Sequence, residues 1–450
     1  YTARDGFQSK GSYVIASSPQ LLLTGQTLSF KADPFVTKVE SASAFDSAGG
    51  VLIEAGRILA QGPAADLRRH YPQAQVIDYG DKLIMAGFID AHVHYPQTAI
   101  IASWGNRLID WLNQYTFPEE MRFGDAAYAQ HSAETYLDLA LAHGTTSLAS
   151  FCTIHPNSVE ALFASADARG MAIVAGKTCM DRNAPEGLRD TAQSAYDQSK
   201  ALLQTWHGQG RARYAITPRF SPTSTPAQLT ALGALWQEFP DCLMQTHLSE
   251  QIDEIAWVKD LFPNARDYLD TYETFGLLGQ RGLYGHAIHL QPREKARLKE
   301  VGAALVHCPT SNSFIGSGLF DMHGLANAGQ RIALATDTGG GSSFSMLRTM
   351  AAAYEIGQLN GHPLHPAQLL WLATMGSARS LHLEHEIGSL TPGKYADLVV
   401  LDLASTPAIA QRQRQADDHW SSLFPTIMMG DDRAIHSVWI KGAERHSKTS

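Results

Sequence analysis

The fold is decided by Gly87-Phe-Ile-Asp-Ala-His-Val-His-Tyr-Pro-Gln97. An apolar run that begins at Leu83 predicts a buried strand leading directly into His92 and His94. Because side chains alternate along a strand, these two imidazoles share one face at its end. Pro96 then ends the strand, since it has no N–H to donate. The pair suits a metal ion that takes nitrogen ligands, although an isolated His-x-His also occurs on solvated strands.

The overall composition is that of an ordinary globular protein. The chain has 450 residues, 44% hydrophobic and 18% charged, and a formal net charge of −9. This negative charge disfavours a broad surface for nucleic acid or anionic membrane, so we expect neither as a partner. The 4 cysteines are scattered, which favours neither a disulfide framework nor a thiolate zinc site. With no signal peptide and no membrane-spanning run, a cytoplasmic location is expected.

The central part of the chain alternates short apolar strands with longer helical patterns, which is typical of repeated strand–helix units around a parallel sheet. The strands are expected to end near His94, Phe151, Thr178, Phe220, Ser249, His289, Pro309 and Asp337. Eight such strands predict an α/β fold of the TIM (β/α)8 barrel type, whose functional residues gather at the C-terminal strand ends.

Both ends of the chain are rich in short strands and turns. Tyr13–Ala16 is one expected strand, and Ala55-Gly56 marks a hairpin turn. We therefore expect residues 1–82 and 385–450 to form one small β-sandwich domain, with the barrel, residues 83–384, inserted between them.

Ligand-type side chains fall at further strand ends. His247 lies near the end of the fifth strand, His286 near the end of the sixth and Asp337 at the end of the eighth, and on a barrel they meet His92 and His94 at one rim. A single histidine or aspartate at a strand end is usually structural. This nitrogen-rich set with one carboxylate instead suits zinc, and iron is possible.

Longer stretches of the sequence resemble a known family. Gly87–His94, Thr246–Glu250 and Ala335–Asp337 resemble the amidohydrolase superfamily. More specific are the stretches that resemble the guanine deaminases within it: His94–Gln97, Trp111–Glu120, Met180–Pro185, Pro218–Phe220 and Pro309–Asn312. The resemblance runs from about residue 50 to about residue 440.

The resemblance implies a metal-dependent hydrolase with one zinc ion per chain and guanine as its small-molecule substrate. It implies metal ligands at His92, His94, His247 and Asp337, and catalytic roles for Glu250, His286 and Asp337. It implies that the purine is held by Gln97, Arg219 and Phe220, with His247, Glu250 and Asp337 also facing it. A homodimer is expected as well.

The expected chemistry follows from these roles. Zinc lowers the pKa of its water towards neutrality, and Glu250 would move a proton from that water to N3 of guanine. Addition at C2, with Asp337 and His286 orienting the nucleophile, would then release ammonia and leave xanthine. Alternatives are a hydrolase acting on another aminated or chlorinated heterocycle, and a metal-free binding protein.

Recognition can be predicted from what guanine presents. Arg219 can donate to O6, the Gln97 amide suits the N1–H and N3 edge, and Phe220 suits the flat face. Arg219 could instead form a barrel salt bridge, and Phe220 could be a core residue. The segment from Ile100 to Phe123 could cover the pocket as a lid or form a dimer contact.

Two further residues have open roles. Asp90 could fix a ligand imidazole or cap the turn. The fourth strand ends without the lysine that bridges two metals in some superfamily members, and Lys177 is expected in a salt bridge. One metal ion is therefore expected.

Overall fold

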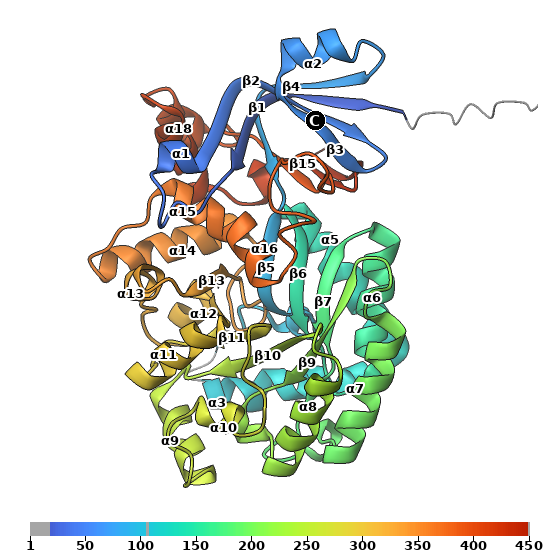
Figure 1. Ribbon diagram of the computed structural model, residues 1–450, viewed down its shortest axis with the longest axis vertical. Helices are drawn as coiled ribbons and strands as arrows, with labels where there is room; N and C mark the ends of the chain where they lie inside the picture. The colour runs from blue at the N-terminus through green and yellow to red at the C-terminus, as the bar shows by residue number, and fades with distance from the viewer. Residues whose placement is uncertain (1–18, 105–107, 449–450) are drawn as a thin grey trace, which may run out of the picture.

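Eight parallel strands form the centre of the molecule in the computed structural model, which describes residues 19–104 and 108–448 (Figure 1). In hydrogen-bonded order they are β5 (Phe88–His94), β6 (Thr145–Phe151), β7 (Ala172–Gly176), β9 (Ala212–Pro218), β10 (Leu243–Leu248), β11 (Gly282–His286), β12 (Ala304–His307) and β13 (Arg331–Leu334). The short β8 (Thr178–Cys179) pairs with β9. The N–H of Asp337 donates to the carbonyl of His92 at 3.0 Å, which links the last strand back to the first.

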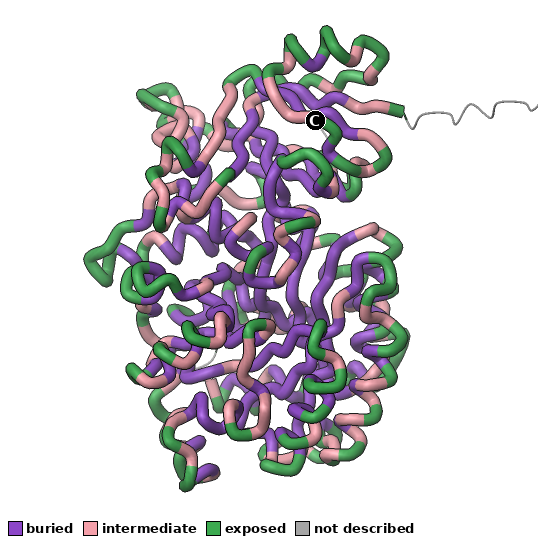
Figure 2. The backbone as a smooth tube through the Cα atoms, viewed as in Figure 1, coloured by how far each residue is buried: buried purple, intermediate pink, exposed green. Residues whose placement is uncertain are grey.

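Helices surround this barrel. They are α5 (Ala126–Ala142), α6 (Pro156–Arg169), α7 (Ala192–Trp206), α8 (Pro226–Glu238), α9 (Ile252–Leu261), α10 (Asp270–Glu273), α11 (Pro292–Val301), α12 (Pro309–Phe314), α13 (Met322–Asn327), α14 (Met346–Leu359), α15 (Pro366–Trp371) and α16 (Ser377–Ser380). Local sequence sets their ends: Asp125 accepts from two backbone N–H groups at the start of α5, and Gly170, at φ 74°, ends α6. In Figure 2 the strands are buried while the outer helices expose one side. The predicted TIM barrel is confirmed.

The two chain ends share a second, seven-stranded sheet. Its order is β16 (Ala443–Ser447), β15 (Ile435–Ile440), β14 (Leu398–Leu401), β4 (Gln75–Ala86), β1 (Leu21–Phe30), β2 (Ser43–Glu54) and β3 (Arg57–Pro63). The helices α1 (Val39–Ala42), α2 (Ala64–His70), α17 (Pro407–Gln413) and α18 (His419–Met429) belong to the same two ends of the chain. The hairpin predicted at Ala55-Gly56 joins β2 to β3. The strand expected at Tyr13–Ala16 lies outside the described residues.

One strand prediction is wrong. The apolar run from Leu83 into His94 is not a single strand, because Leu83 and Met85 pair with β1 and β14 in the terminal sheet. The chain passes into the barrel at Gly87, where a Cβ would lie only 2.1 Å from the side chain of Thr146. Only glycine fits this crossing, and the barrel strand therefore starts at Phe88.

A β-bulge sets the direction of the two histidines in β5. Ile89 and Ala91 belong to the cluster inside the barrel, whereas Val93 packs in the outer layer towards the helices. The pairing with β6 shifts register between Asp90 and Val93. Such a bulge inserts a residue and re-aims the side chains that follow, so His92 and His94 face inward.

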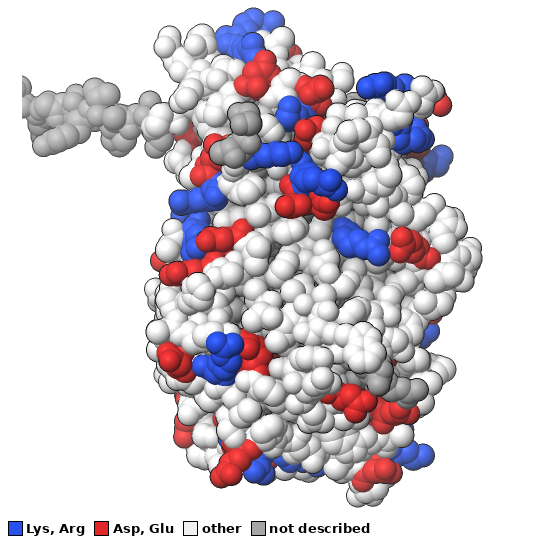
Figure 3. Space-filling view, turned by 180° about the vertical axis from the view of Figure 1, so that it is seen from behind, with Lys and Arg blue, Asp and Glu red and all other residues white. Residues whose placement is uncertain are grey.

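One face of the molecule shows how its charged side chains are distributed. On the face in Figure 3, basic and acidic side chains lie mixed in small groups with uncharged surface between them. Among the residues described, no helix combines the length and apolar character needed to cross a bilayer.

Candidate active site

Four buried side chains converge at the C-terminal rim of the barrel. Nε2 of His94 lies 3.1 Å from Nε2 of His247, and Oδ1 of Asp337 lies 3.5 Å from Nε2 of His92 and 3.6 Å from Nε2 of His94. Ligands of a tetrahedral zinc ion, at about 2.0–2.1 Å from the metal, would lie roughly 3.3 Å from one another. The spacing of these donor atoms fits such an ion.

The hydrogen bonds of these imidazoles favour the same conclusion. Nδ1 of His247 is 2.7 Å from the carbonyl oxygen of Arg219, so this nitrogen carries the ring proton and the Nε2 lone pair faces His94. Nε2 of His92 is buried without a hydrogen-bond partner among residues 19–104 and 108–448. A cation would satisfy both features.

Burial also keeps these rings in their metal-binding form. Desolvation, reinforced by neighbouring imidazoles, holds the pKa of His94 and that of His247 well below the usual value. Desolvation likewise lowers the pKa of His92. Neutral imidazole is the form that binds a metal.

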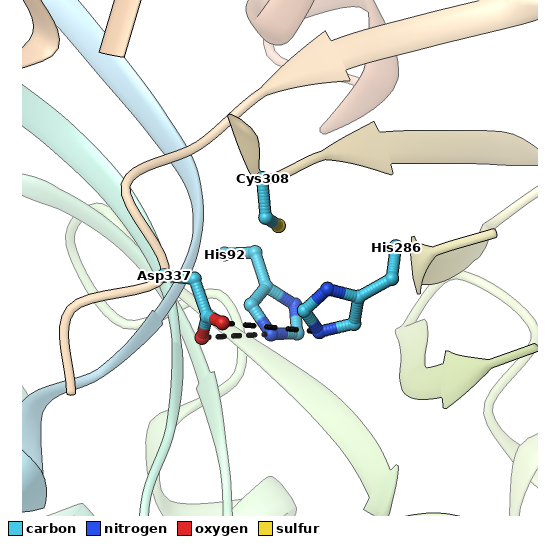
Figure 4. Close-up of side chains that lie close together, drawn as sticks. All are labelled: His92, His286, Cys308 and Asp337. Atoms are coloured by element: carbon cyan, nitrogen blue, oxygen red, sulfur yellow. Dashed lines mark ion pairs between the residues drawn. The ribbon is translucent and has the colours of Figure 1, made fainter. Parts of the chain in front are cut away.

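Glu250 and His286 lie against this group. Nε2 of His286 is 3.6 Å from Oε2 of Glu250 and 3.8 Å from Oδ2 of Asp337, and Figure 4 shows its ring facing Asp337. Burial opposes protonation of His286, but the charges of Glu250 and Asp337 outweigh it and raise its pKa. Asn312 fixes the ring, since its Oδ1 lies 2.9 Å from Nδ1 of His286. With Nδ1 held by Asn312, Nε2 is the ring nitrogen that faces the carboxylates of Glu250 and Asp337.

The backbone is strained where these residues leave their strands. Ser249, His286 and Asp337 have φ angles of 49°, 64° and 51°, in the left-handed region that residues with a Cβ rarely adopt. Such conformations concentrate at functional sites, where the surrounding structure holds them.

Cys308 is a neighbour of this site. Figure 4 shows it beside His92, His286 and Asp337, with ligand-type atoms of all four within 4.8 Å of one another. Burial, followed by the charge of Asp337, raises the pKa of Cys308 well above its usual value. The sequence predicts the imidazoles and Asp337, and not Cys308, as the metal ligands.

A pocket opens over the four candidate metal ligands. Its lining includes the residues that the sequence predicts for catalysis and purine binding: Gln97, Arg219, Phe220, His247, Glu250, His286 and Asp337. Only His92 lies outside the lining, beside Asp337. The structure therefore brings the predicted site residues together.

The sequence missed three polar residues of this site. Glu120 pairs with Arg219 at 2.8 Å, so the ion pair considered as the alternative for Arg219 is present. Ser317 donates to Oε1 of Glu250 at 2.8 Å, and Asn312 orients His286. Glu120 and Asn312 are the last residues of two stretches that resemble the guanine deaminases. This resemblance is the sequence signal that could have identified them.

The structure assigns contacts to Asp90 and Lys177. Both oxygens of Asp90 accept hydrogen bonds from Thr336, through its N–H at 2.9 Å and its hydroxyl at 2.5 Å. Asp90 therefore links β5 to the residues that follow β13, next to Asp337. Neither of these two hydrogen bonds is to an imidazole. Lys177 is fully buried and lies 2.6 Å from Asp190, which confirms its predicted salt bridge.

The described parts of the segment from Ile100 to Phe123 cover one side of the pocket. They form η1 (Tyr95–Ile100, beginning before the segment), α3 (Leu108–Trp111), the π-helix η2 (Leu112–Thr116), α4 (Phe117–Met121) and the start of η3 (Arg122–Gly124). Leu108, Trp111 and Leu112 line the pocket. This position agrees with a cover over the site.

Comparison with known proteins identifies the family. The amidohydrolase family matches residues 83–444, and an imidazolonepropionase-like composite domain of bacteria matches residues 49–74. The guanine deaminase of Escherichia coli K12 is 42% identical over 406 residues, 90% of this chain and 92% of that protein.

Solved structures agree with this match. A structure of E. coli guanine deaminase has a TM-score of 0.93 and 39% identity, covering 95% of this chain and 100% of that one. Guanine deaminase from C. acetobutylicum, solved with guanine in its active site, has a TM-score of 0.85 and 27% identity, with coverage of 94% and 99%. The chain therefore belongs to the guanine deaminases of the amidohydrolase family.

Proposed function

We propose that this enzyme hydrolyses guanine to xanthine and ammonia, a step of purine breakdown. The observation that carries the proposal is one pocket in which a buried set of metal-type donors adjoins an acid–base pair and a polar wall. Hydrolytic deamination requires all three: a water activated near neutral pH, a proton carrier, and groups that hold the ring.

We infer that the metal is one zinc ion per chain, held by His92, His94, His247 and Asp337. Three imidazoles and one carboxylate are typical zinc ligands, and iron remains the alternative. When bound, the ion supplies a water whose pKa lies near neutrality. Lys177, whose ammonium pairs with Asp190, is not placed to bridge a second metal ion.

Glu250 is the proposed proton carrier. Ser317 holds its Oε1, while its Oε2 faces His286 and is available to the reacting water. Glu250 takes a proton from that water and delivers it to N3 of guanine, which makes C2 electrophilic. His286 donates from Nε2 and, with Asp337, orients the attacking oxygen and stabilises the charge that develops.

The ring is held by the pocket wall. Arg219 donates to O6, the amide of Gln97 contacts the N1–H edge, and Phe220 covers a face of the purine. All three side chains are buried, so their hydrogen bonds and contacts act in a site from which water is excluded.

Oligomeric state and location are inferred as well. Trp104, Ile109 and Met121 expose large apolar side chains on the segment over the pocket, which supports a homodimer contact there. Sedimentation equilibrium tests this inference. A cytoplasmic location is proposed from the composition, and the domain limits at 82/83 and 384/385 stay predictions.

The deciding experiment measures ammonia release from guanine by the purified enzyme, with and without a chelator. We expect about one zinc per chain, turnover that the chelator abolishes, and recovery when zinc is restored. A zinc-loaded, folded enzyme that releases no ammonia from guanine would contradict the proposed function.

A further inference from the structure

Glu120 is a buried carboxylate to which the deamination chemistry assigns no role. Its side chain, on α4, is only 1% exposed, and it touches two residues of the pocket wall without lining the pocket itself. Nη1 of Arg219 donates to both carboxylate oxygens, at 3.0 and 2.8 Å. Nε2 of Gln97 donates to Oε1 at 2.9 Å. Since all three residues are buried, these hydrogen bonds are shielded from water.

The hydrogen bond to Glu120 decides which end of the Gln97 amide is left for a ligand. A carboxylate paired with a guanidinium only accepts, so the amide nitrogen has to face it. Oε1 then lies at the other end of the amide, close to Gly339, where a Cβ would come within 2.1 Å of it. No donor to this oxygen is found in residues 19–104 and 108–448. Gln97 therefore offers an acceptor.

Arg219 presents hydrogen-bond donors to the ligand, whereas Gln97 presents an acceptor. Its pair with Glu120 uses Nη1, and the guanidinium keeps further donors for a ligand. The wall thus presents a donor beside an acceptor. This pattern complements a lactam edge, in which a carbonyl oxygen lies beside a ring N–H.

We propose that Glu120 is the positioning residue that makes this pocket selective for purines with a lactam edge. It acts through Gln97 and Arg219, by fixing which of their atoms accept and which donate. The proposal rests on the guanine deamination proposed above and extends it to the choice among 2-aminated purines.

Three substrates separate this role from a general effect on activity. Guanine has the lactam edge, 2-aminopurine keeps the reacting amine but lacks both O6 and N1–H, and 2,6-diaminopurine reverses the donor and acceptor. The wild-type enzyme should prefer guanine over 2,6-diaminopurine by a kcat/KM ratio on the order of 10⁴, because mismatched polar groups would be buried unpaired.

Glu120→Gln is the test variant, since its neutral amide no longer dictates the orientation of Gln97. We expect kcat/KM on guanine to fall roughly 10²-fold, mainly through KM, while kcat/KM on 2-aminopurine changes by less than about threefold. The preference over 2,6-diaminopurine should shrink accordingly. An equal loss on all three substrates would overturn the proposal.

Glu119→Gln is the matched control on the same helix. Glu119 is buried too, but it binds Arg122 at 3.0 Å and the hydroxyl of Tyr128 instead of the pocket wall. Its substitution should leave the ratios among the three substrates unchanged. A shift as large as that of Glu120→Gln would also contradict the proposal.

A double variant covers the case in which Glu120→Gln does not fold. In Gln97→Glu/Glu120→Gln the carboxylate and the amide exchange places, so residue 97 again presents an acceptor to the ring. We expect it to fold and to prefer guanine over 2,6-diaminopurine, and loss of this preference in the folded protein would refute the role. If the wild-type enzyme holds zinc and deaminates 2-aminopurine but not guanine, the proposed function itself fails.

Discussion

At the scale of single residues, we propose that Glu250 transfers protons and that its neighbours bind the metal ion. Glu250→Gln should retain zinc and still bind guanine, because the carboxylate is outside the proposed ligand set. Turnover should fall by a factor on the order of 10² to 10⁴, the usual contribution of a general acid–base group. Metal content and steady-state kinetics on the same preparation check this. Near-normal turnover of the zinc-loaded variant would sink the assigned role.

Substitution of His247, unlike that of Glu250, should remove the bound zinc. His247→Ala removes one of the nitrogens that lie 3.1 Å apart, so both bound zinc and activity should be lost. Metal analysis after dialysis gives the readout. The exposed His70, on α2, serves as the matched control and should keep its zinc when changed to alanine. Stoichiometric zinc in His247→Ala would show that the ligand is misassigned.

Much of the site was predictable because the chemistry resides in residue types with few alternatives. His92, His94, His247 and Asp337 stand at strand ends in the sequence, and the barrel brings strand ends together. The polar residues that hold the side chains of the site in place were harder to predict from the sequence. Ser317 reaches Glu250 from 67 positions away along the chain, in a loop whose sequence carries no pattern for that contact.

At the scale of secondary-structure elements, the strand count and the strand ends followed from hydrophobic patterning, but the local geometry of β5 did not. A bulge between Asp90 and Val93 turns the side chains that follow, and alternation alone would have sent His92 and Ala91 to opposite faces. The passage of the chain from the terminal sheet into the barrel at Gly87 was not predictable from the hydrophobic pattern either. Apolar residues continue through it, so the pattern shows one strand where the structure has two.

The segment over the pocket supports a prediction at this scale. Trp111 is buried, lines the pocket and donates from Nε1 to the carbonyl of Ser103 at 3.3 Å. Trp111→Ala should loosen this cover and admit water, raising KM for guanine about 10-fold or more with a smaller change in kcat. Guanine kinetics check it. Ile109→Ala, on the exposed side of the same helix, should leave KM unchanged, and an equal effect of both variants would contradict a covering role for Trp111.

At the scale of the whole molecule, a buried ion pair ties the terminal sheet to the barrel. Arg211, immediately before β9, donates to both oxygens of Asp397, which precedes β14, at 3.1 and 2.5 Å. The backbone N–H of Lys441 donates to the same carboxylate at 3.0 Å. The partners are 186 positions apart, a separation at which local sequence patterns hold no information about pairing. The sequence could therefore predict the two sheets but not how they are joined.

Asp397→Asn tests how much this tie contributes. Asparagine cannot neutralise the guanidinium, so Arg211 would remain buried with its charge uncompensated, and the free energy of unfolding should fall by about 3–5 kcal/mol. Urea unfolding followed by circular dichroism measures the loss, and kcat/KM of the folded enzyme should stay near the wild-type value. The exposed Asp138, which pairs with Arg169 at 2.7 Å, is the control, and Asp138→Asn should change stability by less than about 1 kcal/mol. If both variants unfolded at the same urea concentration as the wild type, the pair would add no net stability, and packing between the sheets and their helices would have to hold the chain ends in place.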